Sequence, residues 1–280
     1  MRTALLPDGS MVSAFHYNER VHGKKLYCID KNCNAELIFV SGTSTTVPYF
    51  KTTGKSKKSR HSILCGFYRP LTFEEGLSKI KEYQNEYLKN DEIEVNVVQL
   101  NMERIDPELS TEHREEKQEK KSGSRKQRKK SNDDELPKTI GSLQTLVNLF
   151  EKFEPDILAT IFVEMDGKKI PLSDFILSHD VAHERLWSGK LPNDVHCFVY
   201  GIVEQILRRR KVHYINFKPV NNVLFSLVLF EPYFPYFNYK DEQLLGKKVL
   251  AWGQLRKNTY NDKNTSEMII KSNKYLYCLE

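Results

Sequence analysis

The sequence predicts a multidomain α+β chain: a small N-terminal α+β module, a basic linker, a helical segment and a C-terminal five-stranded β-barrel. Three observations support this prediction. Two close pairs of Cys and His residues lie near the N-terminus, a highly charged stretch interrupts the chain, and strand-like segments fill residues 191–280. With 280 residues, 39% of them hydrophobic, the chain is long enough to form more than one core.

The change in composition after residue 105 sets the domain boundaries. Between residues 106 and 136 the large aliphatic residues are Leu109 and Leu136, and there is no aromatic residue. Such a segment buries too little apolar surface to offset its chain entropy, so we expect a charged flexible linker. The predicted parts are a zinc-binding α+β domain (1–105), the linker (106–138), a helical and hairpin segment (139–190) and a barrel domain (191–280).

The N-terminal part begins with short strand-like segments that are separated by turn residues. We expect strands at 2–6, 11–15, 25–28, 36–40 and 46–50. Thr72 resembles an N-cap, Glu74 and Glu75 occupy the first turn, and apolar residues follow at helical spacing. This pattern predicts a helix over 72–88, and residues 92–100 return to the alternation of a strand.

The segment between linker and barrel combines two helical patterns with one hairpin. Helical periodicity predicts a helix over 142–153, which stops before Pro155. Strand patterns at 157–164 and 168–172 flank Asp166-Gly167, a hairpin signal. Ser173 is the expected N-cap of a helix that runs to Trp187.

The last 90 residues contain five predicted strands. They lie at 195–207, 212–218, 223–230, 247–256, and 268–271 extended through 275–279, with a short helix at 240–245. Gly201 and Gly253 lie inside strands, where bends or bulges are expected. Five strands with a helix between the third and the fourth is the order of an OB-fold. Another small barrel or a mixed sheet would fit the same pattern.

A metal site is predicted from Cys28-x4-Cys33 and His61-x3-Cys65. Thiolate and imidazole ligands suit Zn²⁺, and four such ligands close a tetrahedral structural site. The predicted cofactor is therefore a structural zinc ion. The alternative is that the three cysteines are ordinary buried thiols and that His61 lies on the surface.

Part of this N-terminal pattern resembles the zinc module of CoiA-like competence proteins. The resemblance covers about residues 1–70 and is carried by Ala4, Gly9, Val12-Ser13-Ala14, Tyr27-Cys28-x4-Cys33 and Pro48-Tyr49-Phe50. The sequence departs from the family by having four residues, not two, between its first cysteines, and no histidine in 48–52. The resemblance therefore implies a zinc module only if His61 and Cys65 complete the ligand set. That family is also similar to restriction-type nucleases, but no carboxylate–carboxylate–lysine core follows Cys65.

A second resemblance covers residues 192–280. The phrases VYGIVEQI, LLGKKVLAWGQL and EMIIKSNKYLYCL are similar to OB domains of nucleic-acid enzymes, including that of exonuclease VII large subunits. The resemblance implies an OB-fold over 191–280 that binds nucleic acid.

OB-folds bind nucleic acid over their second and third strands, between the loops that join strands one to two and four to five. The predicted binding residues are Arg208, Arg209, Arg210 and Lys211 in the first loop, Arg256, Lys257, Tyr260 and Lys263 in the second, and Tyr214 and Lys218 on the strands, with Asn216 beside them. Cations contact phosphates and rings stack on bases. The alternative is that these polar turns only keep the domain soluble.

Three further groups allow a structural and a functional interpretation. Cations at 51–60 could bind phosphate or form a solvated loop. The six aromatic residues between 230 and 239 could stack bases or dock a partner, but packing of the barrel end is the preferred interpretation. His179 and His183, at i and i+4 on a predicted helix, could hold a metal beside carboxylates or be partly buried side chains.

The sequence as a whole predicts a nucleic-acid-binding protein, with single-stranded DNA as the partner and no catalytic residue assigned. The net charge of +6 is concentrated at 51–60, 120–130 and 208–211. No secretory signal and no membrane-length apolar run is seen, so a cytoplasmic protein without a membrane partner is expected. It would assist DNA replication, recombination, transfer or defence. The alternatives are a metal-dependent nuclease and a protein-interaction adaptor that uses the barrel and its aromatic segment.

Overall fold

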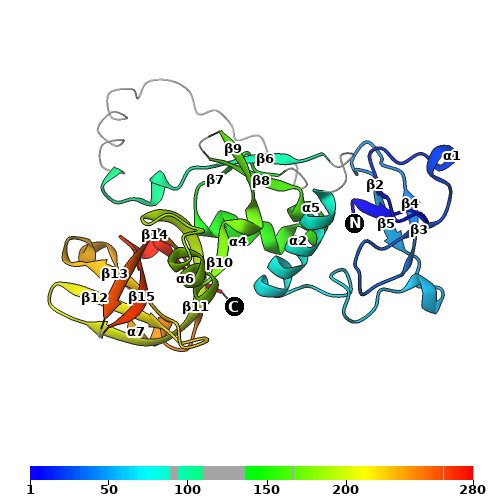
Figure 1. Cartoon of the computed structure of the whole chain (residues 1–280). Coiled ribbons are helices and arrows are strands. Elements are labelled where there is room, and N and C mark those ends of the chain that lie inside the picture. Colours follow the sequence, from blue (N-terminus) through cyan, green and yellow to red (C-terminus); the bar gives the residue numbers. More distant parts are fainter. Residues whose placement is uncertain (89–93, 110–135, 166, 261, 280) are drawn as a thin grey trace, which may run out of the picture. The chain divides into compact units, whose positions relative to one another are not determined.

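The computed structural model describes residues 1–88, 94–109, 136–165, 167–260 and 262–279, and contains helices together with several β-sheets (Figure 1). The predicted α+β class is therefore confirmed. Most of the predicted linker, including the basic run at 120–130, lies outside the described residues. None of the helices in the described ranges has the length and hydropathy that crossing a lipid bilayer requires.

The chain divides into two compact units that are each built from two stretches of sequence. The first unit consists of Met1–Val97 and Val147–Ser173, and the second of Val98–Leu146 and Asp174–Glu280. The predicted segment 139–190 is thus shared between the two units. Helix α4 (Leu143–Lys152) crosses the division, as does strand β6 (Asn96–Leu100).

An antiparallel sheet of five short strands forms the N-terminal part of the first unit. Its spatial order is β2-β1-β3-β4-β5. The strands are β1 (Thr3–Leu5), β2 (Met11–Ser13), β3 (Leu26–Tyr27), β4 (Glu36–Val40) and β5 (Tyr49–Thr52), with the short helices α1 (Glu19–His22) and η1 (Lys57–Ser59) between them. The last strand, expected at 46–50, begins three residues later and ends two residues later.

Helix α2 (Phe73–Tyr87) supplies much of the core of the first unit. Thr72 is the N-cap, as the sequence predicts, and forms a capping box with Glu75, while the helix buries Leu77, Ile80 and Tyr83. Helix α5 (Pro155–Ala159) packs against α2 (Figure 1). The prediction of a strand from residue 157 is wrong for its first residues, because Pro155 at the first helical position begins a new helix.

After α5 the chain forms a hairpin of β8 (Ile161–Met165) and β9 (Lys168–Pro171). The single turn η3 (Leu172–Asp174) follows. These strands pair antiparallel, with Val163 opposite Ile170. Asp166 of the predicted turn lies outside the described residues, whereas Gly167 has a φ of 73°, the left-handed conformation that favours glycine.

The largest sheet lies in the second unit and has the strand order β10-β11-β12-β13-β15-β14-β16, with β11 also paired to β14. Its strands are β10 (Ile176–Ser178), β11 (Val195–Arg208), β12 (Val212–Phe217), β13 (Leu224–Phe230), β14 (Lys248–Tyr260), β15 (Lys263–Ile269) and β16 (Leu276–Leu279). Strands β13 and β15 run parallel, and the other pairs among β11 to β16 are antiparallel.

Short helices connect these strands. Helix α6 (His179–Trp187) precedes β11, while η4 (Glu231–Tyr236) and α7 (Asp241–Leu244) lie between β13 and β14, and η5 (Asn273–Tyr275) lies between β15 and β16. The second unit also contains η2 (Glu103–Ile105) and β7 (Thr139–Ile140), which pairs with β6.

Two predicted elements of the second unit need correction. The helix expected from Ser173 begins only at His179, because buried Ile176 and Leu177 belong to β10, which pairs parallel with β11. The fifth predicted strand is two strands, β15 and β16, since the chain turns through η5 between them. Strand β14 is 13 residues long and pairs with β11, β15 and β16.

Both glycines that the sequence marks inside strands lie at close contacts. A Cβ on Gly201 would lie 2.6 Å from the ring of Phe217, and one on Gly253 would collide with the carbonyl oxygen of Ile269. The pairing of β11 with β12 shifts register between Val203 and Gln205, which places an irregularity a few residues after Gly201, where a bend or bulge was expected. Glycine is therefore needed where β11 and β14 bend closely over their neighbours.

Candidate metal centre and nucleic-acid interface

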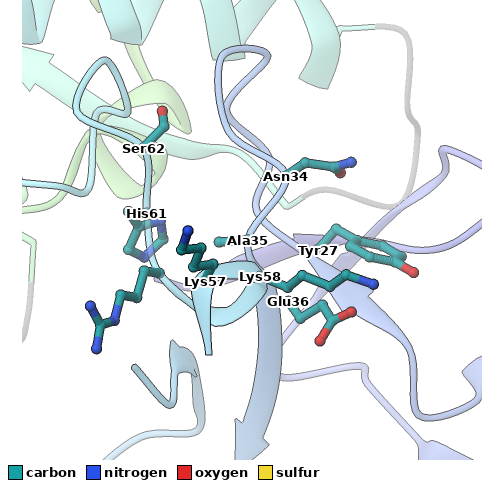
Figure 2. A pocket seen from close by; sticks show the side chains of 9 residues that line it. Tyr27, Asn34, Ala35, Glu36, Lys57, Lys58, His61 and Ser62 are labelled. Atoms are coloured by element: carbon teal, nitrogen blue, oxygen red, sulfur yellow. The ribbon is translucent and has the colours of Figure 1, made fainter. Parts of the chain in front are cut away.

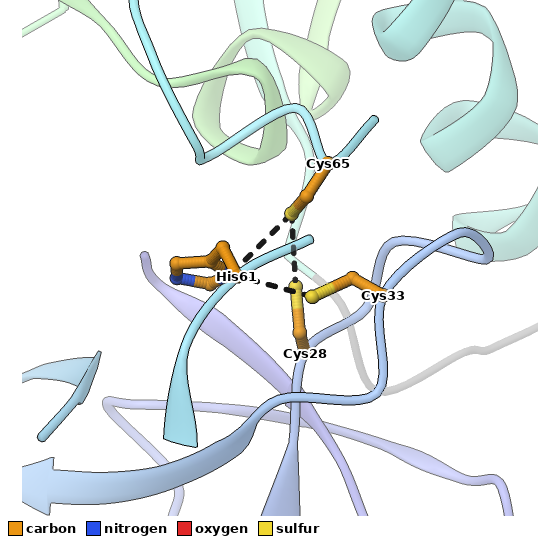
Figure 3. Close-up of side chains that lie close together, drawn as sticks. All are labelled: Cys28, Cys33, His61 and Cys65. Atoms are coloured by element: carbon orange, nitrogen blue, oxygen red, sulfur yellow. Dashed lines mark hydrogen bonds between the residues drawn. The ribbon is translucent and has the colours of Figure 1, made fainter. Parts of the chain in front are cut away.

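The four predicted metal ligands of the first unit lie together (Figure 3). Cys28 directly follows β3 and Cys33 lies in the turn before β4, which is closed by hydrogen bonds from Cys28 N to Ala35 O and from Cys33 N to Asp30 O. His61 follows η1, and Cys65 lies in the loop before α2. One ligand atom from each residue lies within 4.8 Å of the others.

Three of the six separations between the ligand atoms are close to the edges of a tetrahedron around a metal ion. The Sγ atoms of Cys28 and Cys65 are 3.6 Å apart, and His61 Nδ1 lies 3.3 Å from Cys65 Sγ and 3.5 Å from Cys33 Sγ. Bonds of about 2.3 Å to sulfur and 2.0–2.1 Å to nitrogen give tetrahedral edges of roughly 3.6–3.8 Å. The four side chains could therefore bind one metal ion with only a small contraction or expansion of the cluster.

Two of the three thiols, Cys33 and Cys65, are shifted toward the thiolate form that binds metal. A hydrogen bond from Cys28 lowers the pKa of Cys33 to about 4 and that of Cys65 to about 7, whereas the pKa of Cys28 is raised by the same contacts. The hydrogen bond to Cys65 raises the pKa of His61. Because all three cysteines are buried, the site has the closed character of a structural centre rather than an open catalytic one.

A buried carboxylate, Asp30, holds the two ligand loops together. Its Oδ1 accepts a hydrogen bond from Asn32 N, and its Oδ2 accepts from Gly66 N at 2.8 Å and from the Tyr83 hydroxyl at 2.7 Å. Lys79 Nζ lies 2.8 Å from the same oxygen. Burial raises the pKa of Asp30, but Lys79 and the hydrogen bonds outweigh it and leave the pKa below its usual value. Asp30 thus links both ligand pairs to helix α2.

Replacing Asp30 with Asn is expected to destabilise the first unit by about 1–3 kcal/mol, because the buried charge that accepts from Lys79, Tyr83 and Gly66 is lost and Lys79 keeps only Glu82 as its ion-pair partner. Loss of such support around metal ligands also lowers metal affinity, typically about 10–100-fold. Urea denaturation and competition with a zinc chelator measure the two effects. Asp8→Asn, in an exposed turn, is the control and should change neither. Equal stability and metal affinity for Asp30→Asn and Asp8→Asn would contradict this role.

In the second unit, the predicted basic loop forms the turn from β11 to β12. Arg208 Nη2 lies 2.7 Å from Asp241 Oδ1 and also donates to the carbonyl of Tyr239, so this residue serves the fold. Arg209 lies over the Tyr214 ring at 5.8 Å, and Arg210 and Lys211 are exposed. Three exposed cations therefore stand at this turn beside an aromatic ring.

The second predicted loop is shorter than the sequence suggests, since its residues belong to the paired ends of β14 and β15. Lys263 pairs opposite Tyr260, whose side chain is 61% exposed. Arg256 lies opposite buried Glu267 and donates two hydrogen bonds to its carboxylate. Lys257 Nζ lies 5.2 Å from the Trp187 ring centre. Arg256 is thus held by an ion pair, while Tyr260 and Lys263 project from a hairpin arm.

The register places these two groups at opposite ends of β12 and β13. Val212, next to the basic turn, pairs with Phe230 at the end of β13, whereas Leu224 at its beginning pairs with Thr265 near the hairpin arm. Lys218 is exposed just after β12. Asn216 links the strands by donating to Gln205 and accepting from Ser226.

This polar link continues across the sheet, a feature that the sequence did not reveal. The Cα partners run in one row through Gln205, Asn216, Ser226, Glu267 and Arg256. These residues are brought together only by the register of the strands. Their spacing along the chain therefore could not predict that they lie in one row. The row forms a band of polar side chains between the two basic ends, with hydrogen bonds from Gln205 through Asn216 to Ser226 and between Glu267 and Arg256.

His179 and His183 do not belong to a metal cluster among the described residues. His179 is buried and packs edge-on against Phe217, 5.5 Å between ring centres, while His183 Nδ1 lies 2.9 Å from Ser266 Oγ. The aromatic segment is likewise engaged in packing: Phe234 stacks on His213 at 3.8 Å, and the Tyr233 hydroxyl donates to Glu108. Both groups fit the structural interpretation.

Burial lowers the pKa of His179, so acidification is expected to weaken the second unit. The unfolded chain takes up the proton first, so the stabilisation is complete above the unfolded pKa of about 6.5 and is lost as pH falls below it. Urea midpoints at pH 7.5 and 5.5 measure the difference. His179→Gln should reduce the pH dependence, whereas His16→Gln at an exposed position should not. An unchanged dependence in His179→Gln would contradict the prediction.

Comparison with known proteins gives little beyond the geometry. No family model matches the chain, and no curated protein matches it. Among solved structures, the chain is similar to one described as "OBody AM3L09 bound to hen egg-white lysozyme", with 11% identity and a TM-score of 0.24 over 31% of this chain and 84% of that chain. A TM-score this low supports no conclusion about fold or function.

Proposed function

We propose that this protein binds single-stranded DNA on a C-terminal OB-fold and that a structural zinc ion stabilises its N-terminal unit. The pairing order supports the barrel: it runs β11-β12-β13-β15-β14 and returns to β11. The parallel pairing of β13 with β15 agrees with an OB-fold. Helix α7 also agrees with it, because it lies between β13 and β14, the third and fourth of these strands along the chain. The five strands would then form one closed sheet around the core of the second unit.

The observation that carries the proposed ligand is the placement of charge and rings around β12 and β13. Arg209, Arg210 and Lys211 lie at one end of these strands, and Tyr260 and Lys263 lie on the arm at the other. A strand of nucleic acid that crosses the polar band would meet phosphate-binding cations at both ends and an exposed ring for a base. Backbone contacts and stacking carry little sequence preference, so broad specificity is expected.

The zinc ion would stabilise and not catalyse in this proposal. Three buried cysteines and one histidine fill all four positions of a tetrahedral site, which leaves no position for a reacting water. The protein is proposed as a cytoplasmic accessory factor in DNA replication, recombination, transfer or defence.

Fluorescence anisotropy of the full chain with a labelled oligonucleotide tests the function. Single-stranded DNA, duplex DNA and RNA of the same sequence are compared at several salt concentrations. The expected result is preferential binding of single-stranded DNA, with an affinity that falls as salt rises. Absence of binding at low salt would overturn the proposal, and metal-dependent degradation of the oligonucleotide would favour a nuclease.

A further inference from the structure

A groove of about 680 Å³ lies beside the metal ligands in the first unit (Figure 2). Its walls include Tyr27 from β3, Glu36 from β4, Lys57 and Lys58 from η1, and Arg60. In Figure 2 the side chains of Lys57 and Lys58 lie between the Tyr27 ring on one side and His61 on the other. The volume is within the range of about 300–1,000 Å³ that is typical of ligand sites.

The charge of the groove favours an anionic ligand. Three cations line it against one carboxylate, that of Glu36. Three thiolates and a divalent ion at the neighbouring metal centre would add only one further negative charge. The three cations therefore exceed the negative charge around them. Residues 51–60 contain no acidic residue that would reduce this excess.

The local structure fixes the backbone that carries these cations. The Ser56 hydroxyl caps η1 by accepting from Ser59 N, and Arg60 Nε donates to the carbonyl of Gly54 at 2.9 Å. The segment that the sequence allowed to be a solvated loop is therefore a bent, hydrogen-bonded element that ends at metal ligand His61. Ordering this backbone before binding reduces the entropy that a ligand must remove.

The other wall offers groups that recognise a base. The Tyr27 ring is half-buried at the edge of the groove, and the Asn34 amide lies near it (Figure 2). Aromatic rings stack on bases of any sequence, and an amide can donate to and accept from a base edge. An inorganic anion would need only the cations, whereas the combination of cations, ring and amide fits a nucleotide unit.

We infer that this groove is a second binding site for single-stranded nucleic acid, in which Lys57, Lys58 and Arg60 contact phosphates and Tyr27 stacks on a base. The inference rests on the proposed function for the class of its ligand, but it places the contact in the first unit. The metal centre then has a positioning role, because it fixes the end of the segment that carries the cations.

Photocross-linking of the full zinc-loaded chain tests the inference. Single-stranded DNA that contains 5-iododeoxyuridine is bound, illuminated and digested, and the modified tyrosines are identified by mass spectrometry. Cross-links at Tyr27 are expected from the groove and at Tyr260 from the barrel. Cross-linking at Tyr27 alone would support the groove and contradict the barrel site, cross-linking at Tyr260 alone would overturn the groove, and neither would overturn both.

Charge reversal provides the matched comparison. Lys57→Glu with Lys58→Glu should reduce cross-linking at Tyr27 by about tenfold or more at 0.1 M salt, since two phosphate contacts are lost. Arg20→Glu with Lys152→Glu makes the same change of charge at exposed positions elsewhere in the first unit and should leave the cross-link unchanged. If the groove variant loses zinc while cross-linking at Tyr27 persists, the cations serve the metal centre and the inference is wrong.

Discussion

Replacing Cys65 with serine is expected to release the metal ion and to destabilise the first unit by several kcal/mol. The hydroxyl of serine cannot replace the thiolate as a zinc ligand, and in small zinc domains the binding free energy, about 10–16 kcal/mol at pH 7, is also folding free energy. The first unit has a core of its own around Phe50 and Tyr83, so part of its structure should persist. A loss of about 4 kcal/mol would lower its melting temperature by on the order of 15 °C.

Elemental analysis and calorimetry measure both effects on the full chain. The wild type should carry one zinc per chain, and Cys65→Ser should carry none. Cys278→Ser makes the same chemical change at a half-buried cysteine in the second unit and should keep both the zinc and the lower melting transition. A wild type without bound metal after expression in zinc-supplemented medium would contradict the assignment, as would full zinc content in Cys65→Ser.

The metal ligands could be predicted from the sequence because each pair is local. Four residues separate Cys28 from Cys33 and three separate His61 from Cys65, and such spacings restrict where a turn can place two side chains. The buried carboxylate of Asp30 could not be predicted as their support, because Lys79 and Tyr83 reach it from a helix some 50 residues further along the chain. Local spacing contains no information on contacts of this kind.

The errors in the elements have a related cause. Pro155 ends one helix and begins the next, and both roles satisfy its fixed φ angle. Strand β10 has three residues, too few to show a period, and it exists because β11 provides a parallel partner. The pairing of Arg256 with Glu267 likewise depends on the register of β14 with β15, so the sequence assigned Arg256 to a loop and to DNA.

Reversing the charge of Arg209, Arg210 and Lys211 to glutamate is expected to lower the affinity for single-stranded DNA by about 100-fold at 0.1 M salt. Each phosphate contact with single-stranded nucleic acid contributes about 0.7 to the slope of log affinity against log salt. Losing three contacts should therefore reduce that slope by about 2 and weaken binding most at low salt. Anisotropy titrations of the full chain over a salt series measure both quantities.

Arg208 is left in place in this variant because its ion pair with Asp241 supports the fold, and its loss would confuse a binding effect with a folding effect. The matched control reverses three other exposed cations of the second unit, Lys190, Lys247 and Lys274. The control changes the net charge equally, so any general repulsion of DNA is the same in both proteins. If the barrel binds DNA, the two variants should differ in their affinity for single-stranded DNA and in the slope of log affinity against log salt. Their melting temperatures should be the same. Equal affinities and slopes would mean that the turn between β11 and β12 does not contact DNA.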